Sequence, residues 1–303
     1  MLHVLWAPVN LMIGRARETG FSPLGIGCVR WLSLALLLSA LLLSPDFRRF
    51  SGYKSMPKRD WAKSLLIGFL FFGPAHLLYY SSMGLTSEVE GTVLLTTSPL
   101  WTAIMSFFLL KDEAMSPRRW SAILLSFVGA YIVAVGFKIP DMLGHTKGNL
   151  MFGSGVIIEC FMGIIAARIS RRTSGVSVLV GQMWGGAAAF WLAAAVLGSS
   201  LPLTVPAFSF GTFYPMLYLI LISGIVTFTI WYRIVETSPL TLLVVAIAVQ
   251  PPIAALLSWA VDHKIPSQNT VFGAVVILAA LVLGFLGEKA HLEPSLDPPG
   301  PAG

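Results

Sequence analysis

The sequence predicts an all-α integral membrane protein with ten transmembrane helices in two inverted five-helix repeats. Of its 303 residues, 56% are hydrophobic and only 11% are charged, whereas soluble domains carry about a quarter charged residues. Apolar runs of about 20 residues, the length that a helix needs to cross a bilayer, recur along the chain. Adding 152 to the residue number takes Tyr80 to Tyr232, Pro99 to Pro251 and Ala103 to Ala255 without a gap, which indicates an internal repeat.

The positive net charge of the chain does not predict a nucleic-acid partner. The net charge is +6, but the basic residues form short clusters between apolar runs, as is usual beside membrane spans. Cys28 and Cys160 both fall inside expected helices, so no disulfide framework is predicted. The first apolar run lacks a basic flank and a small-residue cleavage site, so no removable signal peptide is expected.

The first expected span is short. Its apolar run, Leu2–Gly14, covers about 13 residues before Arg15 and Arg17, fewer than a span needs. Arginine snorkelling would extend it by a turn, and a truncated N-terminus is an equal alternative. Eight of the other nine spans are expected at about residues 22–44, 61–83, 89–110, 148–168, 176–198, 212–233, 240–261 and 269–287. The remaining one, the fifth, follows the Lys111–Arg119 segment and ends near Phe137.

This division gives each half five spans. The first repeat covers residues 1–137, a linker 138–147, the second repeat 148–288, and a Pro- and Gly-rich tail, 289–303, is expected to be disordered. An odd number of spans per half inserts the second half upside down relative to the first. Fourteen of the twenty Lys and Arg residues fall in the loops on one side and five on the other, which predicts a cell-membrane protein with both termini in the cytoplasm.

A family resemblance rests on the fourth and fifth expected spans. The run Pro99-Leu100-Trp101-Thr102-Ala103, followed by Asp112-Glu113 and Gly129, resembles the corresponding hairpin of EamA-type carriers in the drug/metabolite transporter superfamily. Pro251 with Ala254-Ala255, Gly273 and Gly284 is similar to the partner hairpin, and Ser22-Pro23-Leu24 leading to Arg30 also fits. The resemblance covers spans 2 to 10 and implies a transporter fold without naming a substrate.

The sequence departs from the family pattern in two places. The glutamate that the family carries after its ninth span is replaced by Asp262-His263-Lys264. The first span is also shorter than is normal in the family. Closure of the expected substrate cavity on the side of this span therefore does not follow from the resemblance.

Glu159 is the sharpest candidate for function. It stands near the middle of the sixth expected span with apolar residues on both sides, where an unpaired carboxylate costs several kcal/mol or is protonated. It would then couple transport to protons or meet the ammonium group of a substrate. A structural ion pair or a neutral, hydrogen-bonded acid is the alternative.

Arg30 lies about two turns into the second expected span. Its planar guanidinium would hold a substrate carboxylate. Alternatively it snorkels to the interface or pairs with Glu88 or Glu90 in the turn between spans 3 and 4.

An aromatic face is expected in each half. Phe72, His76 and Tyr80 recur every four residues and so share one helix face; the repeat maps His76 to Phe228 and Tyr80 to Tyr232, beside Trp231. We expect the two faces to line a small-molecule cavity, whose rings would also suit a cation. The alternatives are interfacial belts for the Tyr and Trp residues, and for His76 a bond to a backbone carbonyl.

Three amides are further candidates for substrate contact. Gln182, which stands at the repeat position of Arg30, and Gln250 lie inside expected spans and need partners. Hydrogen bonding between helices is equally open for both, and the same holds for Asn10 in the first apolar run.

Proline and glycine are expected to shape the helices. Pro99 and Pro251 each remove a backbone donor and kink a helix, either to gate a pathway or to satisfy packing. Five glycines are expected where neighbouring helices approach closely: Gly68, Gly155, Gly163, Gly224 and Gly273.

Together these features predict a secondary transporter, expected to be an exporter, that moves a small organic metabolite by alternating access. An acid, an arginine and aromatic walls would suit an amino-acid-like zwitterion. An intramembrane enzyme is the alternative, although no His-Glu-x-x-His or Gly-x-Ser-x-Gly motif is present. A channel is less favoured because ionisable residues are few within the spans. No cofactor or metal is expected; proton or counter-substrate coupling and a monomer or homodimer all remain open.

Overall fold

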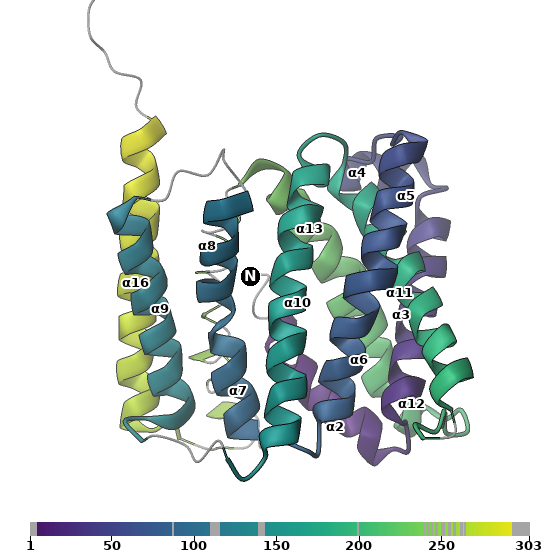
Figure 1. Ribbon diagram of the computed structural model, residues 1–303, viewed down its shortest axis with the longest axis horizontal. Coiled ribbons are helices and arrows are strands. Elements are labelled where there is room, and N and C mark those ends of the chain that lie inside the picture. Colours follow the sequence, from purple (N-terminus) through teal and green to yellow (C-terminus); the bar gives the residue numbers. More distant parts are fainter. Residues whose placement is uncertain are drawn as a thin grey trace, which may run out of the picture.

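The computed structural model describes residues 5–86, 88–109, 116–138, 143–198, 200–238 and 265–292, with single residues between 240 and 263. Side chains are described for all of these except residues 88, 89 and 285–292. Within this part of the chain the regular elements are helices, and no β-strand is formed (Figure 1).

Several helices join end to end into longer rods. α5, η1 and α6 form one continuous helix, as do α12, η2 and α13, where η1 and η2 are π-helical segments. The elements are α2 (Val9–Glu18), α3 (Pro23–Leu41), α4 (Pro45–Ser51), α5 (Lys58–Ile67), η1 (Gly68–Phe72), α6 (Gly73–Ser82), α7 (Glu88–Thr96), α8 (Ser98–Leu109), α9 (Pro117–Val135), α10 (Thr146–Ser170), α11 (Gly175–Leu197), α12 (Phe210–Leu217), η2 (Tyr218–Val226), α13 (Thr227–Thr237) and α16 (Gln268–Leu292).

The protein is a multi-pass membrane protein by helix length and composition. Among the described residues, seven helices are long and apolar enough to span a bilayer, and α16 adds a shorter apolar stretch, Gln268–Gly284. These eight helices coincide with expected spans 2 to 8 and 10. The first span corresponds to the ten-residue α2, and most of the ninth lies outside the described residues, so the count of ten stays a prediction.

Two local features differ from the sequence-based expectation. α2 continues to Glu18 instead of ending at Gly14, and the Arg17 guanidinium in this added turn donates to the carbonyl oxygen of Met83 at 2.5 Å. The basic loop after the second span contains the short helix α4, which starts at Pro45 after the Ser44 cap and ends at Gly52 with a φ of 62°.

A serine followed by proline starts several helices. The Ser22 hydroxyl accepts a hydrogen bond from the Gly25 amide at 3.0 Å, and Ser116 accepts one from the Arg119 amide at 3.2 Å. Proline at the first helical position costs no hydrogen bond, because that amide has no partner inside the helix. These caps fix where α3 and α9 begin.

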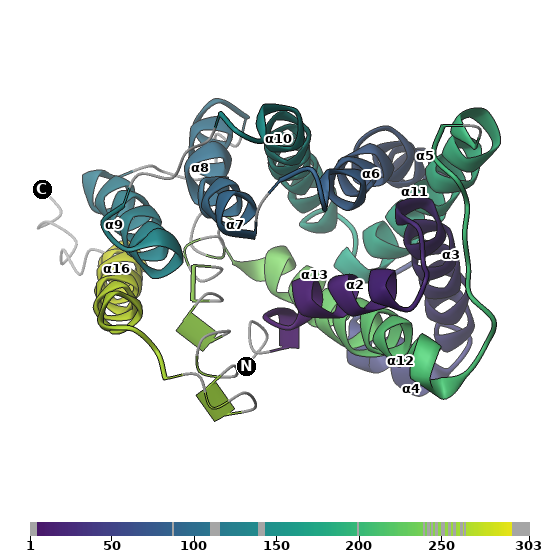
Figure 2. The same ribbon diagram turned by 90° about the horizontal axis from the view of Figure 1, so that it is seen from below.

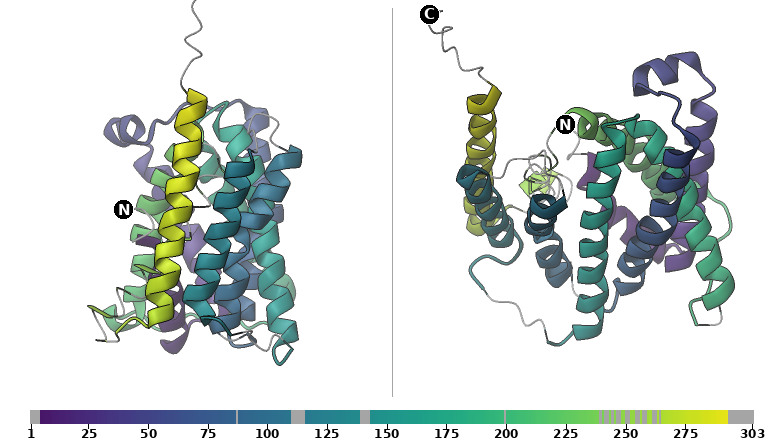
Figure 3. Two further views of the ribbon diagram at one scale, coloured as in Figure 1. Left: turned by 90° about the vertical axis from the view of Figure 1, so that its left-hand side faces the viewer. Right: turned by 45° about the horizontal axis from the view of Figure 1, so that its top comes forward.

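α9 and α16 form a closely packed pair at one edge of the molecule (Figures 1 and 3). A Cβ atom on Gly129 would lie 2.9 Å from the carbonyl oxygen of Gly273, and one on Gly273 would lie 2.6 Å from that of Gly129. The expected close approach at Gly273 is therefore confirmed, and the same is true of Gly68, Gly155 and Gly224. Gly163 contradicts the expectation, because a Cβ atom there would have no heavy atom of the described residues within 4 Å.

Contacts between the halves recur at the repeat offset. Ser22 donates to the carbonyl oxygen of Thr204 at 3.4 Å, and Ser174 donates to that of Gly52 at 3.2 Å; each position of the first pair maps onto the second pair when 152 is added or subtracted. Similarly, α3 packs on η2 while α11 packs on η1. An inverted repeat would produce these paired contacts.

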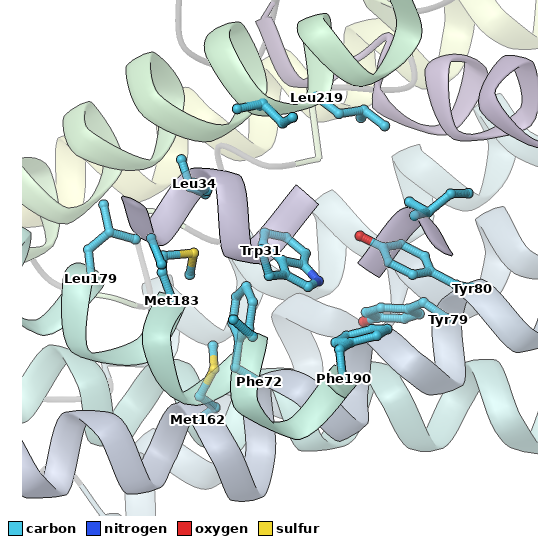
Figure 4. Close-up of a cluster of buried hydrophobic side chains, with 14 of the residues drawn as sticks. Trp31, Leu34, Phe72, Tyr79, Tyr80, Met162, Leu179, Met183, Phe190 and Leu219 are labelled. Carbon is cyan, nitrogen blue, oxygen red and sulfur yellow. The ribbon is translucent and has the colours of Figure 1, made fainter. Parts of the chain in front are cut away.

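The main apolar core surrounds Trp31 (Figure 4). Its ring meets Phe72 edge to face at 4.6 Å between centroids and His76 at 4.7 Å, a favourable geometry for aromatic pairs. Trp31, Phe72 and Tyr80 are all almost fully buried. The core thus fixes the face of α3 and the η1–α6 rod that borders the cavity described next.

Candidate functional site

A cavity of about 270 Å³ lies in the middle of the helix bundle. Seen end-on, α2 and α13 lie opposite α10 and α6 (Figure 2), and all four helices contribute to its wall. The lining residues are Trp6, Ala7, Val9, Asn10, Ile13, Arg30, Phe72, His76, Tyr79, Tyr80, Met83, Leu95, Ser98, Thr102, Phe152, Val156, Glu159, Cys160, Met162, Gly163, Ala166, Ser223, Phe228, Trp231, Tyr232, Val235 and Leu240.

Arg30 is a buried cation in this wall, with only 3% of its surface exposed. Its guanidinium donates to the Tyr80 hydroxyl at 2.9 Å and the Ser223 hydroxyl at 3.0 Å. The guanidinium carbon also lies 4.4 Å from the centroid of the Trp31 ring, within the range of a cation–π interaction.

No carboxylate among the described residues forms an ion pair with Arg30. The expected alternative pair with Glu90 is not formed, since that carboxylate contacts Asn149 at 3.1 Å and His145 at 2.9 Å; the side chain of Glu88 lies outside the described residues. A buried charge without a counter-charge is costly. The cavity therefore favours an anionic group beside Arg30.

Glu159 supplies the opposite charge. It projects from α10 into the cavity, and its carboxylate accepts a hydrogen bond from the Tyr79 hydroxyl at 2.7 Å. Tyr79 and Tyr80 are thus adjacent residues whose hydroxyls hold a carboxylate and a guanidinium, respectively. Because both charged groups line one cavity, it can meet both ends of a zwitterion.

His76 combines the two arrangements that the sequence left open. It lines the cavity, and its Nδ1 donates to the carbonyl oxygen of Phe72 at 2.9 Å, one turn earlier in η1. The ring also lies edge to face with Tyr79 and Tyr80. With Nδ1 occupied, Nε2 is the nitrogen left for another partner.

The second half carries a related pair without a charge. The Tyr232 hydroxyl donates to Gln182 Oε1, so Gln182 and Tyr232 repeat the Arg30–Tyr80 contact at the 152 offset. Gln182 is fully buried behind Tyr232 and does not line the cavity, and its Nε2 atom has no hydrogen-bond partner in the described structure.

Trp231 and Phe228 complete the aromatic wall of the second half. Trp6 packs against both rings, with centroid distances of 5.3 and 5.6 Å. This contact brings the start of the chain onto the cavity. Asn10, one helical turn later, also lines the cavity.

Pro99 is buried in α8, and the helix that contains it is interrupted at Thr97. The Thr97 hydroxyl bonds the carbonyl oxygen of Leu94 at 2.6 Å, and the neighbours Ser98 and Thr102 line the cavity. The break therefore falls at cavity depth. Gln250 and Pro251 lie outside the described residues.

Sequence reasoning missed several lining residues. Tyr79 carried a signal, because it lies three residues after His76 and so falls near the same helix face. Ser223, a small polar residue in an apolar run, and Trp6, ahead of the first regular helix, carried none. No group of three His, Cys, Asp or Glu side chains is placed to hold a metal ion in the described part of the chain.

The fold and the cavity define a multi-pass, all-helical membrane protein with a charged central cavity. Residues 1–135 match the model of the EamA-like transporter family. The match confirms the resemblance drawn from the sequence over these residues.

Similar proteins include two from Bacillus subtilis (strain 168). The uncharacterized transporter YdfC is 25% identical over 93% of this chain and 88% of its own length. The uncharacterized transporter YyaM is 21% identical over 86% of this chain and 84% of its own length.

One solved structure, titled only as the crystal structure of a protein, has the same fold. It matches with a TM-score of 0.76 and 17% identity, covering 96% of each chain. Family and relatives support a membrane transporter, and they favour a transporter over an enzyme.

Proposed function

We propose that this protein is a secondary transporter that moves a small, amino-acid-like metabolite by alternating access, in the direction of export. The central cavity is its substrate site. The observation that carries the proposal is the presence of Arg30 and Glu159 in one cavity of about 270 Å³. A substrate with a carboxylate and an ammonium group would satisfy both.

The proposed substrate contacts follow from this geometry. The carboxylate binds at Arg30, where the guanidinium has only hydroxyl and ring partners. The ammonium binds at Glu159 beside Tyr79, and His76, Tyr232, Trp231 and Asn10 border the remaining space. Gln182 supports Tyr232 from behind, whereas Gln250 stays a sequence-based candidate.

The proposed mechanism uses the two halves as inverted repeats, residues 1–137 and 148–288, joined by the linker 138–147. Their rocking about the cavity would expose the substrate to either side in turn. The paired contacts Ser22–Thr204 and Ser174–Gly52 support such a symmetry. The helix interruption at Thr97, beside Pro99, and the kink that the sequence predicts at Pro251 would open and close the pathway.

The proposal includes the surroundings of the protein. It lies in the cell membrane with ten spans, both termini in the cytoplasm and a cytoplasmic tail at 289–303. It requires no cofactor and binds no nucleic acid; its partners are the substrate and the lipid bilayer, as a monomer or a homodimer. Protons or a counter-substrate drive it, with Glu159 as the coupling group.

Counterflow into liposomes tests the proposal. Purified protein is reconstituted into liposomes that are loaded with one unlabelled L-amino acid at a time. Uptake of the same amino acid in labelled form is then measured with and without a proton gradient. We expect saturable counterflow, and Glu159→Gln should reduce it at least tenfold or abolish its response to the gradient.

Glu18→Gln is the matched control, because Glu18 is exposed and pairs only with Arg15 at the end of α2. It makes the same chemical change outside the cavity and should leave counterflow intact. Absence of counterflow for every amino acid would contradict the proposal, as would unchanged transport and an unchanged gradient response in Glu159→Gln.

A further inference from the structure

Resting on the proposed function, we infer that the substrate carries a compact apolar side chain, and that Gly163 sets the upper limit on its size. Gly163 lies one turn after Glu159 on α10, and both line the cavity. The space beside Gly163 is a subsite separate from the two charged groups.

The face of α10 that borders this subsite has a regular spacing. Glu159, Gly163 and Ala166 are four and seven residues apart, so they lie on one side of the helix. At about 1.5 Å per residue, Gly163 lies about 6 Å and Ala166 about 10 Å along the axis from Glu159. A substrate whose ammonium meets Glu159 would therefore place its side chain near Gly163.

Free space distinguishes Gly163 from other glycines in the same helix. A Cβ atom on Gly155 would lie 3.1 Å from the carbonyl oxygen of Ala75, so that glycine permits close packing. At Gly163 no heavy atom of the described residues lies within 4 Å of the Cβ position. Glycine inside a helix destabilises it by roughly 1 kcal/mol relative to alanine. Close packing does not explain why a glycine stands at position 163, whereas a need for open space beside the helix does.

The walls of the subsite are apolar. Ala166 from α10, Trp231 and Val235 from α13, and Leu240 line the same cavity as Gly163. Val235 and Leu240 also pack with Ile164 and Ala167, the chain neighbours of Gly163 and Ala166, in a small core cluster. Burial of an apolar group there is favourable in proportion to the area removed from water. Arg30 on α3 donates to Tyr80 on α6 and to Ser223 on η2, so its partners come from helices other than α10, which carries Gly163.

A size series tests the inference. Gly163→Ala, Gly163→Val and Gly163→Leu are compared with the wild type for counterflow and for binding of glycine, L-alanine, L-leucine and L-phenylalanine. We expect a graded loss that starts with L-phenylalanine and reaches at least tenfold for it in Gly163→Val, because single methylene groups change specificity by about 10- to 200-fold. L-Alanine should stay within about threefold.

Gly153→Ala is the matched control, since its Cβ atom would meet only Leu94 at 3.6 Å and it does not line the cavity. Thermal unfolding identifies any variant that misfolds. If Gly163→Leu misfolds, the comparison uses Gly163→Ala and Gly163→Val. Equal losses for all four amino acids, or full retention of L-phenylalanine in Gly163→Val, would overturn the inference alone. Wild-type protein that neither binds nor transports any of them would overturn the proposed function as well.

Discussion

Arg30 shows how a single residue can be held in an apolar bundle without a counter-ion. Two hydroxyls, from Tyr80 and Ser223, accept from its terminal nitrogens, and the Trp31 ring lies beside the guanidinium carbon. The Nε atom is buried and has no partner in the described structure. These contacts orient the planar group, and no carboxylate of the described residues is ion-paired with it, so it can bind a substrate carboxylate bidentately.

Replacement of Arg30 should discriminate between parts of the substrate. In Arg30→Gln, we expect the affinity for an L-amino acid to fall at least tenfold, because hydrogen bonds to charged groups contribute about 1.5–3 kcal/mol each. A primary amine that lacks the carboxylate should lose less than threefold. Titration by intrinsic tryptophan fluorescence in detergent measures both affinities.

Arg30→Lys provides the matched control for charge. Lysine keeps the cation but loses the rigid fork, so its affinity should fall between those of the wild type and Arg30→Gln. Equal effects of Arg30→Gln on the amino acid and the amine would rule out a carboxylate at this position.

Sequence reasoning at this scale found charged residues better than neutral ones. Glu159 and Arg30 were identifiable because charges inside apolar runs are rare and costly. Ser223, a partner of Arg30, was not, because the partner of a charge depends on which helices are neighbours; Tyr79, the partner of Glu159, was marked only by its position near the helix face of His76. Gly163 was misread for the same reason: its role depends on whether a helix or a cavity faces it.

At the scale of elements, the two π-helical segments lie at equivalent positions. Adding 152 to η1, Gly68–Phe72, gives residues 220–224, which fall inside η2, Tyr218–Val226. Each segment packs on the second span of the other half, η1 on α11 and η2 on α3. π-helical turns often mark functional sites, and both segments here supply cavity residues, Phe72 and Ser223.

Gly68 should be indispensable for the packing of η1. A Cβ atom at this position would lie 2.3 Å from the carbonyl oxygen of Gln182 and 2.7 Å from its Cα atom, so backbone must move. We expect Gly68→Ala to destabilise the protein by about 1–3 kcal/mol, the usual cost of overpacking. The midpoint of thermal unfolding in detergent should fall by several degrees.

Gly153→Ala is again the suitable comparison, since its added methyl group makes only an ordinary contact. If the unfolding midpoint of Gly68→Ala fell no further than that of Gly153→Ala, η1 and α11 would not be packed as described. A gain in stability in Gly68→Ala would contradict the packing equally.

The sequence predicted most elements to within a few residues because apolar length and Ser-Pro starts mark helix ends. It did not predict the π-helical segments, since one extra residue per turn hardly alters an apolar run. It also missed α4, a seven-residue helix defined by its Ser44 cap and Gly52 end, because short helices leave no measurable periodicity.

At the scale of the whole molecule, contacts cross between the halves. The first helix of one half packs on the third rod of the other: α2 contacts α12 and η2, and α10 contacts α6. The cavity is consequently enclosed by both halves, and a relative rotation of the halves would change its exit. The sequence predicted an inverted repeat, but neither this pairing nor the pairing of α9 with α16 at the edge.

The orientation of the molecule can be tested independently of transport. The excess of Lys and Arg in alternate loops predicts cytoplasmic termini, so green fluorescent protein fused after Gly303 should fluoresce and alkaline phosphatase there should stay inactive. Fusions after Gly144, in the segment between α9 and α10, should behave in the opposite way, because five spans precede that point in the proposed topology. Activity of alkaline phosphatase at both positions would refute the odd number of spans between them and with it the inverted relation of the halves.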